Sequence, residues 1–122
     1  MNNFKTKFKA SKYHNVKVEV DGITFDSGRE AKRYKSLKEL QQLGIISDLQ
    51  LQVLFELCPA QYVQGFDGKL ICARRSMKYI ADFVYMRDGS KIVEDAKGYL
   101  TPEYKQKKTL MKRIHNIEIK ES

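Results

Sequence analysis

Apolar and polar residues alternate at the start of the patterned part of the chain, and a helical spacing follows. The alternation runs over residues 16–25 and is interrupted by Asp21-Gly22, which predicts a β-hairpin. Over residues 31–43 the apolar positions recur at three- and four-residue spacing. This spacing predicts an amphipathic helix that begins near Ser27 and ends at Gly44.

The spacing of apolar residues changes from helical to strand-like in the next segment. Alternation over residues 49–58 predicts a strand that Pro59 ends, and residues 60–70 read as a turn-rich connection. Residues 79–85 are almost continuously apolar, which predicts a central strand buried on both faces. After a turn, residues 92–97 predict a second strand, so that these two strands form a hairpin.

The last third of the chain contains a strong signal for the start of a helix. Thr101-Pro102-Glu103 combines a hydroxyl cap, a proline at the first helical position and an acid near the positive helix end. We expect this helix to run to about Asn116, and Ile117 and Ile119 predict a short last strand. The order of elements predicts an α/β fold, a small mixed sheet flanked by helices.

The charge balance adds a functional indication. The 122 residues include 23 lysines and arginines against 15 acidic residues, a formal net charge of +8. A basic excess of this size in one small domain is typical of proteins with a polyanionic partner, most often nucleic acid. Because lysines dominate the beginning of the chain, we divide it into a basic N-terminal arm, residues 1–15, and one domain, residues 16–122.

Cysteine usage and hydropathy bear on the compartment. No apolar run approaches the roughly 18 residues of a membrane span, and the N-terminus lacks the apolar core of a secretory signal. Cys58 and Cys72 occur singly, without metal-ligand spacing, so we expect no zinc site and two free, partly buried thiols. These features predict a cytoplasmic protein that does not bind membranes.

An acid stands in the most apolar strand of the sequence. Asp82 would be costly to bury as an unpartnered carboxylate, so a compensating group is expected. On the next strand Asp95 and Lys97 share one face and Glu94 points to the other, and a turn near Asp88 would bring Asp82 beside Asp95. Two converging carboxylates suit Mg²⁺, and the lysine beside them can orient a water or stabilise charge on phosphorus.

Each of these residues also has an ordinary structural interpretation. Glu30 continues the apolar stripe of the first helix and can reach the sheet, but Ser27-x-x-Glu30 is equally a capping box. Asp95 and Lys97 can form a simple ion pair, and Asp82 can be a buried structural acid with hydrogen-bond partners. The conjunction of an acid, a short turn and acid-x-lysine is what favours catalysis.

This arrangement resembles the signature of the PD-(D/E)XK nuclease superfamily. Asp82 is followed after twelve residues by Asp95-Ala96-Lys97, and Glu30 stands where many members carry a further helical acid. Ala81 departs from the signature, which has proline there. Over residues 16–120 the sequence is similar to a group of small phage-encoded proteins of unassigned function placed in this superfamily.

The resemblance implies a fold, a cofactor and a reaction. The fold would be a restriction-endonuclease-like core, and Mg²⁺, for which Mn²⁺ would substitute, would be held by Asp82, Asp95 and the Ala96 carbonyl. Glu30 would hold a second metal or a metal-bound water, and Lys97 would orient the attacking water. The reaction would be hydrolysis of a DNA phosphodiester that leaves a 5′-phosphate, carried out by a homodimer with one site per subunit.

Basic residues near this site suggest where DNA would lie. The second predicted helix carries a lysine stripe, and further basic residues precede the strand of Asp82. A lysine stripe is also typical of a solvated helix face, and no recognition-helix pattern supports sequence-specific reading. The candidate DNA-binding residues are Arg74, Arg75, Lys78, Lys105, Lys108 and Lys112.

The leading interpretation is therefore a metal-dependent DNA endonuclease, structure-selective or junction-resolving. It would serve phage recombination, repair or genome processing in the host cytoplasm. The first alternative is a non-catalytic DNA-binding accessory protein on a nuclease-like fold, and the second is an interaction factor whose basic surface meets an acidic protein. The residues leave the DNA structure open among four-way junction, flap, nick, duplex and single strand.

Overall fold

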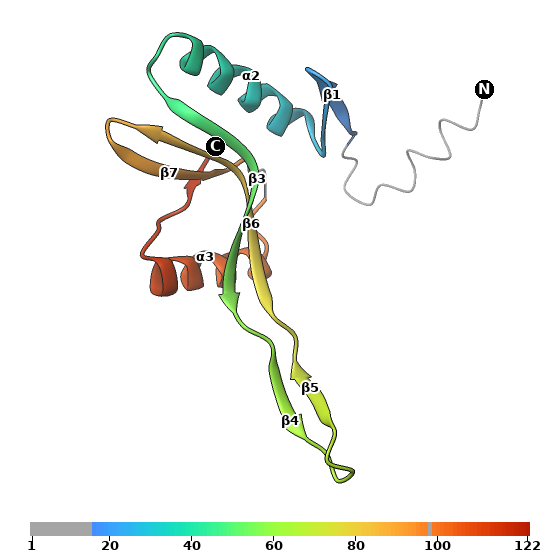
Figure 1. The fold of residues 1–122 in the computed structure, drawn as a ribbon. Helices are drawn as coiled ribbons and strands as arrows, with labels where there is room; N and C mark the ends of the chain where they lie inside the picture. The colour runs from blue at the N-terminus through green and yellow to red at the C-terminus, as the bar shows by residue number, and fades with distance from the viewer. Residues whose placement is uncertain (1–15, 98) are drawn as a thin grey trace, which may run out of the picture.

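The computed structural model describes residues 16–97 and 99–122, so the predicted basic arm at residues 1–15 lies outside the described part of the chain. The first half contains a small hairpin, a long helix and a long strand, and the second half contains most of the sheet and two helical segments (Figure 1). In chain order the elements are β1 (Val18–Val20), β2 (Ile23–Phe25), α2 (Gly28–Gln42), β3 (Ser47–Cys58), β4 (Gln61–Gln64), β5 (Leu70–Arg74), β6 (Met77–Arg87), β7 (Ser90–Asp95), α3 (Pro102–Leu110), a π-helical segment (Met111–His115) and β8 (Lys120–Glu121).

The central sheet is mixed, which confirms the predicted α/β fold class. Four strands follow the order β3-β6-β7-β8, antiparallel except for the parallel pair β7–β8. The tight turn at Asp88-Gly89 sets the register of β6 and β7, with Phe83 opposite Glu94 and Arg87 opposite Ser90. Both turn residues have positive φ, which suits the primed turns of short hairpins.

The two helices cover opposite faces of this sheet. Phe83 and Tyr85 of β6 pack in one buried cluster with Leu37 of α2, whereas Val84 packs in a second cluster with Met111, which follows α3. Neighbouring strand residues point to opposite faces, so this alternation separates the two cores. The prediction that residues 79–85 are buried on both faces holds from Ala81 onward, apart from the partly exposed Asp82, while Ile80 is half exposed.

The predicted helix starts are confirmed by their caps. The Ser27 hydroxyl accepts a hydrogen bond from the Glu30 amide, and the Thr101 hydroxyl accepts one from the Tyr104 amide. The second helix does not continue as an α-helix to Asn116. It gives way at Met111 to a π-helical turn, which Asn116 ends in the left-handed conformation.

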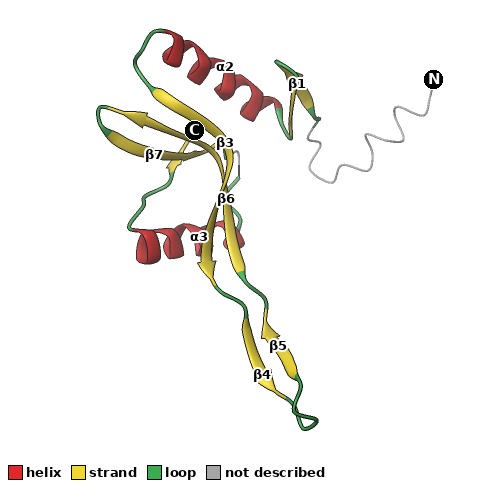
Figure 2. Ribbon diagram, in the orientation of Figure 1, coloured by secondary structure: helices red, strands yellow, loops and turns green. Residues whose placement is uncertain are grey.

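The connection predicted over residues 60–70 is instead part of a hairpin. β4 and β5 pair as an antiparallel ribbon, with Val63 opposite Ile71, and residues 65–68 form its turn. We call residues 61–74 the β4–β5 hairpin. It projects from the body of the molecule beyond the paired strands β3 and β6 (Figure 2). The turn signal at residues 65–68 was interpreted correctly, but the short strands beside it were missed.

Two further sequence expectations are tested by the described residues. Cys58 and Cys72 are both free, as predicted, but Cys72 is exposed rather than partly buried. No helix in residues 16–97 and 99–122 is long and apolar enough to cross a membrane.

Candidate active site

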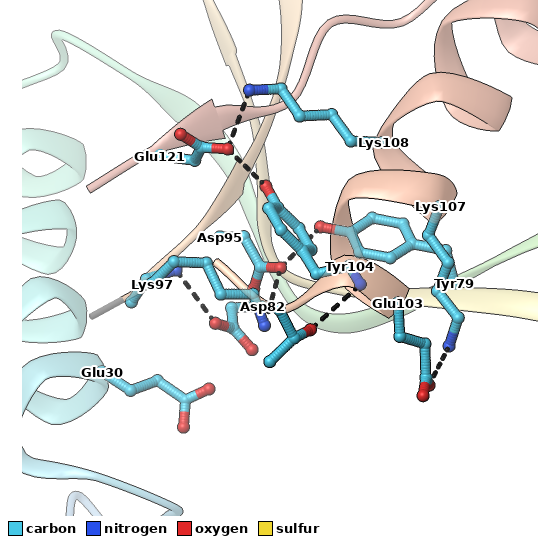
Figure 3. Close-up of polar contacts among 12 residues, drawn as sticks. Glu30, Tyr79, Asp82, Asp95, Lys97, Glu103, Tyr104, Lys107, Lys108 and Glu121 are labelled. Atoms are coloured by element: carbon cyan, nitrogen blue, oxygen red, sulfur yellow. Dashed lines mark hydrogen bonds and ion pairs between the residues drawn. The ribbon is translucent and has the colours of Figure 1, made fainter. Parts of the chain in front are cut away.

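Asp82 and Asp95 are brought together by the β6–β7 hairpin. The register that places Phe83 opposite Glu94 puts the two aspartates at adjacent positions on neighbouring strands. The Ala96 amide donates a hydrogen bond to Asp82 Oδ2 at 3.0 Å, which fixes that carboxylate beside the end of β7. Figure 3 shows the two carboxylates in one cluster with Lys97. The compensating group that the partly buried Asp82 carboxylate requires is thus the backbone amide of Ala96.

Burial and like charge make this pair of acids difficult to ionise together. Asp95 is only 2% exposed. Burial, followed by the neighbouring Asp82 carboxyl, raises the pKa of Asp95 to about 7. Burial also raises the pKa of Asp82, with Glu30 adding to the effect, although Asp95 and the Ala96 amide act in the opposite direction. A cation between the two carboxylates would relieve this repulsion.

Lys97 is held against Asp95. Its Nζ lies 3.3 Å from Asp95 Oδ2 and 4.8 Å from the centre of the Tyr104 ring, over the ring face. The Tyr79 hydroxyl donates a hydrogen bond to the same carboxylate oxygen at 2.9 Å. The Asp95–Lys97 ion pair considered as an alternative is therefore present, and it occurs inside the acidic cluster rather than on an exposed face.

Glu30 approaches this cluster from α2 (Figure 3). Its Oε1 accepts a hydrogen bond from the Asp26 amide at 3.1 Å, so the carboxylate does not complete a capping box with the Ser27 amide. Its Oε2 accepts a hydrogen bond from Gln52 Nε2 at 3.4 Å. The cap at Ser27 and an orientation of the carboxylate toward the sheet therefore coexist.

Gln52 connects the two sides of the site and was missed by the sequence analysis. Its side-chain amide donates to Glu30 and, at 3.3 Å, to Asp82 Oδ1. Its backbone has φ of 53°, unusual for a residue within a strand. At this residue β3 passes from one core cluster to the other, since Leu51 packs against the cluster under α2 and Val53 packs against the cluster under α3. In the sequence Gln52 is one polar residue among several in an alternating strand, so no signal distinguished it.

Glu94 points away from this cluster, as predicted. It is fully buried on the α2 side, where it pairs with the Arg33 guanidinium and accepts a 2.6 Å hydrogen bond from the Tyr85 hydroxyl. Burial alone would raise the pKa of Glu94, but the hydrogen bonds from Arg33 and Tyr85 hold it below its ordinary value. Glu94 is therefore a structural ion-pair residue that joins β7 to α2.

The donor set can be compared with the needs of Mg²⁺. Oxygen ligands from carboxylates and backbone carbonyls are those that Mg²⁺ takes, and Asp82 and Asp95 supply two carboxylates. As placed, the described residues contain no group of three or more Asp, Glu, His or Cys side chains that could hold a metal ion. Glu30 is bridged to Asp82 by the Gln52 amide. The donors that the described residues bring together for Mg²⁺ are thus the carboxylates of Asp82 and Asp95.

A cleft opens beside this cluster on the α3 side. It has a volume of about 290 Å³. Its lining combines Asp95 and Lys97 with further cationic side chains, Lys78 from β6 and Lys107 from α3. Lys107 also lies 3.7 Å from Glu103, so its charge is only partly available. A phosphate in this cleft would meet positive charge from β6, from α3 and from the segment that follows β7, beside the carboxylates of Asp95 and Glu103.

The predicted DNA-binding residues fall into two separate groups. On the α3 side, Lys105 is exposed, but Lys108 pairs with Glu121 at 2.8 Å and Lys112 pairs with Glu118 at 3.4 Å. Arg74, Arg75 and Lys78 lie where the β4–β5 hairpin joins β6. The structure brings Lys78 to the cleft of Asp95. None of the three lysines of the predicted stripe lines that cleft, and the lysine of α3 that does line it is Lys107.

The fold and site define an α/β protein with a mixed sheet and a partly buried cluster of two aspartates and a lysine. The chain belongs to the family described as "Protein of unknown function (DUF1064)", whose sequence profile matches residues 10–121. No curated protein matches the chain, and no solved structure matches it.

Proposed function

We propose that the protein is a Mg²⁺-dependent DNA endonuclease of the PD-(D/E)XK superfamily and of phage origin. The observation that carries the proposal is the cluster of Asp82, Asp95 and Lys97, of which Asp95 and Lys97 line a cleft together with further lysines. Their order and spacing along the chain resemble the superfamily signature. The net charge of +8 supports a polyanionic substrate.

The proposed roles are those that the superfamily resemblance implies for each residue. Asp82, Asp95 and the Ala96 carbonyl would hold Mg²⁺, and Glu30 would hold a second ion or its bound water. Bound Mg²⁺ would supply Lewis-acid stabilisation of the phosphoryl oxygens and acidify a water molecule. The Ala96 amide orients the Asp82 carboxylate, and the Tyr79 hydroxyl orients that of Asp95.

Lys97 would act on the reacting phosphate. Asp95 and the face of the Tyr104 ring hold its ammonium group in place beside the cleft, where it would hydrogen-bond the attacking water and stabilise charge on phosphorus. The water oxygen forms the new bond to phosphorus, and the bond from phosphorus to the 3′-oxygen breaks. The water gives up its protons to solvent and the 3′-oxygen gains one, which leaves 5′-phosphate and 3′-hydroxyl ends.

The test is cleavage of defined DNA by the purified protein. Labelled four-way junction, flap, duplex and single-stranded DNA would be incubated with the protein in Mg²⁺ or in EDTA. We expect cutting in Mg²⁺ alone, lowered at least about 100-fold by Asp82→Asn and by Lys97→Met. Asp88→Asn, in the turn of the same hairpin, is the matched control and should cut normally. Cutting that both site variants retain would overturn the proposal.

A non-catalytic DNA-binding protein is the second candidate, and the Gln52 amide favours it. This amide lies between Glu30 and Asp82 and satisfies both carboxylates without a cation. The two candidates differ in the same assay. Binding of DNA without cutting in Mg²⁺ or Mn²⁺, unaltered by Asp82→Asn, would establish the accessory role and assign the acidic cluster to stability.

The quaternary and cellular parts of the proposal have separate tests. We propose a homodimer with one site per subunit, acting in the cytoplasm of the host cell. Light scattering of the purified protein gives its mass in solution, and a 14.2 kDa species at micromolar concentration would contradict the dimer.

A further inference from the structure

The β4–β5 hairpin is the most exposed part of the described chain. Every residue of β4 and of β5 is exposed, and the ribbon extends away from the sheet and both helices (Figure 1). Neither hydrophobic core cluster includes a residue of the hairpin. A two-stranded ribbon is at best marginally stable alone in water. Because the hairpin contributes no residue to either core cluster, packing within the described chain does not account for its sequence.

The hairpin carries large apolar side chains into solvent. Phe66, at its tip, is fully exposed, and at least half of the surface of each of its other large apolar side chains is exposed. Val63 lies opposite Ile71 in the ribbon, and Tyr62 and Leu70 occupy the alternate positions, so both faces of the hairpin carry apolar side chains. Large apolar side chains gathered in solvent in this way are typical of interaction surfaces. The residues of this set are Tyr62, Val63, Phe66, Leu70 and Ile71.

The charge of the hairpin and its base identifies the kind of partner. Residues 61–78 contain four basic side chains and one acidic side chain, Asp67. A second copy of the hairpin would bring like charges together, so charge complementarity opposes self-association through this surface. A polyanion meets no such repulsion. The basic residues of this segment are Lys69, Arg74, Arg75 and Lys78.

The hairpin is also continuous with the candidate active site. Lys78 follows it on β6 and lines the same cleft as Asp95 and Lys97. From Phe66 to Asp82 the chain runs through the hairpin turn and along β5 and β6, and sixteen residues of extended chain span at most about 53 Å. That length corresponds to about 16 base pairs of B-DNA. One DNA molecule could therefore reach the hairpin and the cleft together.

The apolar residues narrow the kind of DNA. The grooves and backbone of an intact duplex offer polar edges and phosphates, to which Phe66 and Ile71 have little to contribute. Unstacked bases, in contrast, present flat apolar faces that aromatic side chains stack on, and apolar wedges insert at opened base steps. A hairpin with an exposed aromatic residue at its tip and basic residues where it joins the sheet suits DNA in which base stacking is already interrupted.

We propose that the β4–β5 hairpin binds DNA whose base stack is interrupted, as at a flap, bulge or branch point. Phe66 packs against the unstacked bases, while Arg74 and Arg75, at the other end of the ribbon, contact phosphates farther along the DNA toward the cleft. The inference rests on the proposed nuclease function and gives it a substrate class. It places the cut within about 16 nucleotides of the interruption.

The test measures binding apart from cutting. The full-length protein would be titrated in EDTA, by fluorescence anisotropy, with a perfect duplex and with a duplex of equal length that carries a three-nucleotide bulge. We expect Phe66→Ala to weaken binding to the bulged DNA about tenfold and to the perfect duplex less than twofold. Leu43→Ala, which removes an exposed apolar side chain after α2, is the matched control and should change neither.

The arginines have a different expected signature. Arg74→Ala should weaken binding to both DNAs by a similar factor and reduce the slope of log K against log salt concentration by about 0.9. Phe66→Ala should leave that slope unchanged, because it removes no charge. An equal loss on both DNAs in Phe66→Ala, or no loss on either, would overturn the inference.

Two further outcomes would assign the hairpin a different role. A wild-type dimer that dissociates in Phe66→Ala, seen by light scattering without DNA, would overturn the inference in favour of a second copy as the occupant. Metal-dependent cutting that is unchanged by Phe66→Ala on the bulged DNA would also overturn it, while the nuclease proposal would stand. Selective binding lost in Phe66→Ala supports the inference even where no cutting is observed.

Discussion

At the scale of single residues, the ionisation of Asp95 links the candidate chemistry to stability. The carboxyl group is buried beside Asp82, and these two influences raise the pKa of Asp95 to about 7. In the unfolded chain it would titrate near its ordinary pKa of 3.8. Between these values the folded state binds the proton more tightly, so folding stability from this group falls as the pH rises from about 4 to about 7.

Asp95→Asn is therefore expected to stabilise the metal-free protein at pH 8. The neutral amide avoids the burial of a charge, and the raised pKa corresponds to at most about 4 kcal/mol. Urea unfolding in EDTA at several pH values measures the difference, which should shrink as the pH falls toward 4. Asp88→Asn, in the exposed turn, should show no such pH dependence. A less stable Asp95→Asn protein at pH 8 would contradict this prediction.

Tyr79 is expected to keep the pKa of Asp95 from rising further. Its hydroxyl donates to Asp95 Oδ2 and so favours the ionised carboxylate. In Tyr79→Phe the pKa of Asp95 should rise by about one pH unit. A carboxyl ¹³C NMR titration of the metal-free protein measures this pKa. Tyr85→Phe removes the corresponding hydroxyl on the opposite sheet face and should leave Asp95 unaffected; an equal change in both variants would show that the effect is not local to Tyr79.

At the scale of elements, α2 is joined to the sheet by an ion pair as well as by apolar packing. Arg33 is partly exposed, whereas its partner Glu94 on β7 has no exposed side-chain surface. Loss of one member of such a pair leaves a buried charge without its counter-ion, which costs more than loss of a surface pair.

Arg33→Met is expected to destabilise the protein by about 2–3 kcal/mol, because Glu94 would lose its counter-ion. Chemical denaturation measures the loss, and Lys32→Met, one residue earlier on the exposed side of α2, should change stability by less than about 0.5 kcal/mol. The double variant Arg33→Met/Glu94→Gln should recover part of the loss. Equal stability of Arg33→Met and the wild type would show that Glu94 finds another partner.

The β4–β5 hairpin is expected to be dispensable for folding. Replacement of residues 61–74 by Asn-Gly removes only exposed strands and no residue of either core cluster. The thermal midpoint should change by no more than a few degrees, measured by circular dichroism. Loss of cooperative unfolding would mean that the hairpin does contribute to the core.

Sequence reasoning predicted those elements whose signals are local. Helix starts were found at Ser27 and Thr101, because a cap is a short pattern of residue types. The β4–β5 hairpin was missed, since its apolar residues face solvent and burial does not impose a period on them. The π-helical turn after Leu110 was missed because no residue pattern distinguishes it from an α-helix.

In the candidate site, too, the residues marked by local signals were predicted, and those that depend on tertiary contacts were missed. Asp82 and Asp95 were placed together because a tight turn fixes the register of neighbouring strands. Gln52 was missed because its role depends on a positive φ and on the tertiary approach of α2, which composition does not encode. The partial neutralisation of Lys108 by Glu121 was missed for a similar reason, since their elements meet only in the folded chain.

At the scale of the whole molecule, one sheet carries two cores, and β6 belongs to both. Phe83 and Tyr85 contribute to the core under α2, and Val84 and Tyr79 contribute to the core under α3. The candidate site lies where this strand passes from one core to the other, at Asp82. The positions of its side chains therefore depend on the packing of both helices, and a core substitution on either face of the sheet should alter the site.

The tight β6–β7 turn has a consequence for the order of events in folding. Phe83 and Glu94 are eleven residues apart along the chain and pair across β6 and β7, whereas Gln50 must find Val84 across a much longer loop. Short loops close first, so the two aspartates should meet before β3 joins the sheet. Pulse-labelled amide exchange during refolding should show protection in β6 and β7 before β3; simultaneous protection would exclude this order. The acidic pair would then exist for a time without Gln52 and Glu30, with its carboxylates open to water and to any dissolved cation.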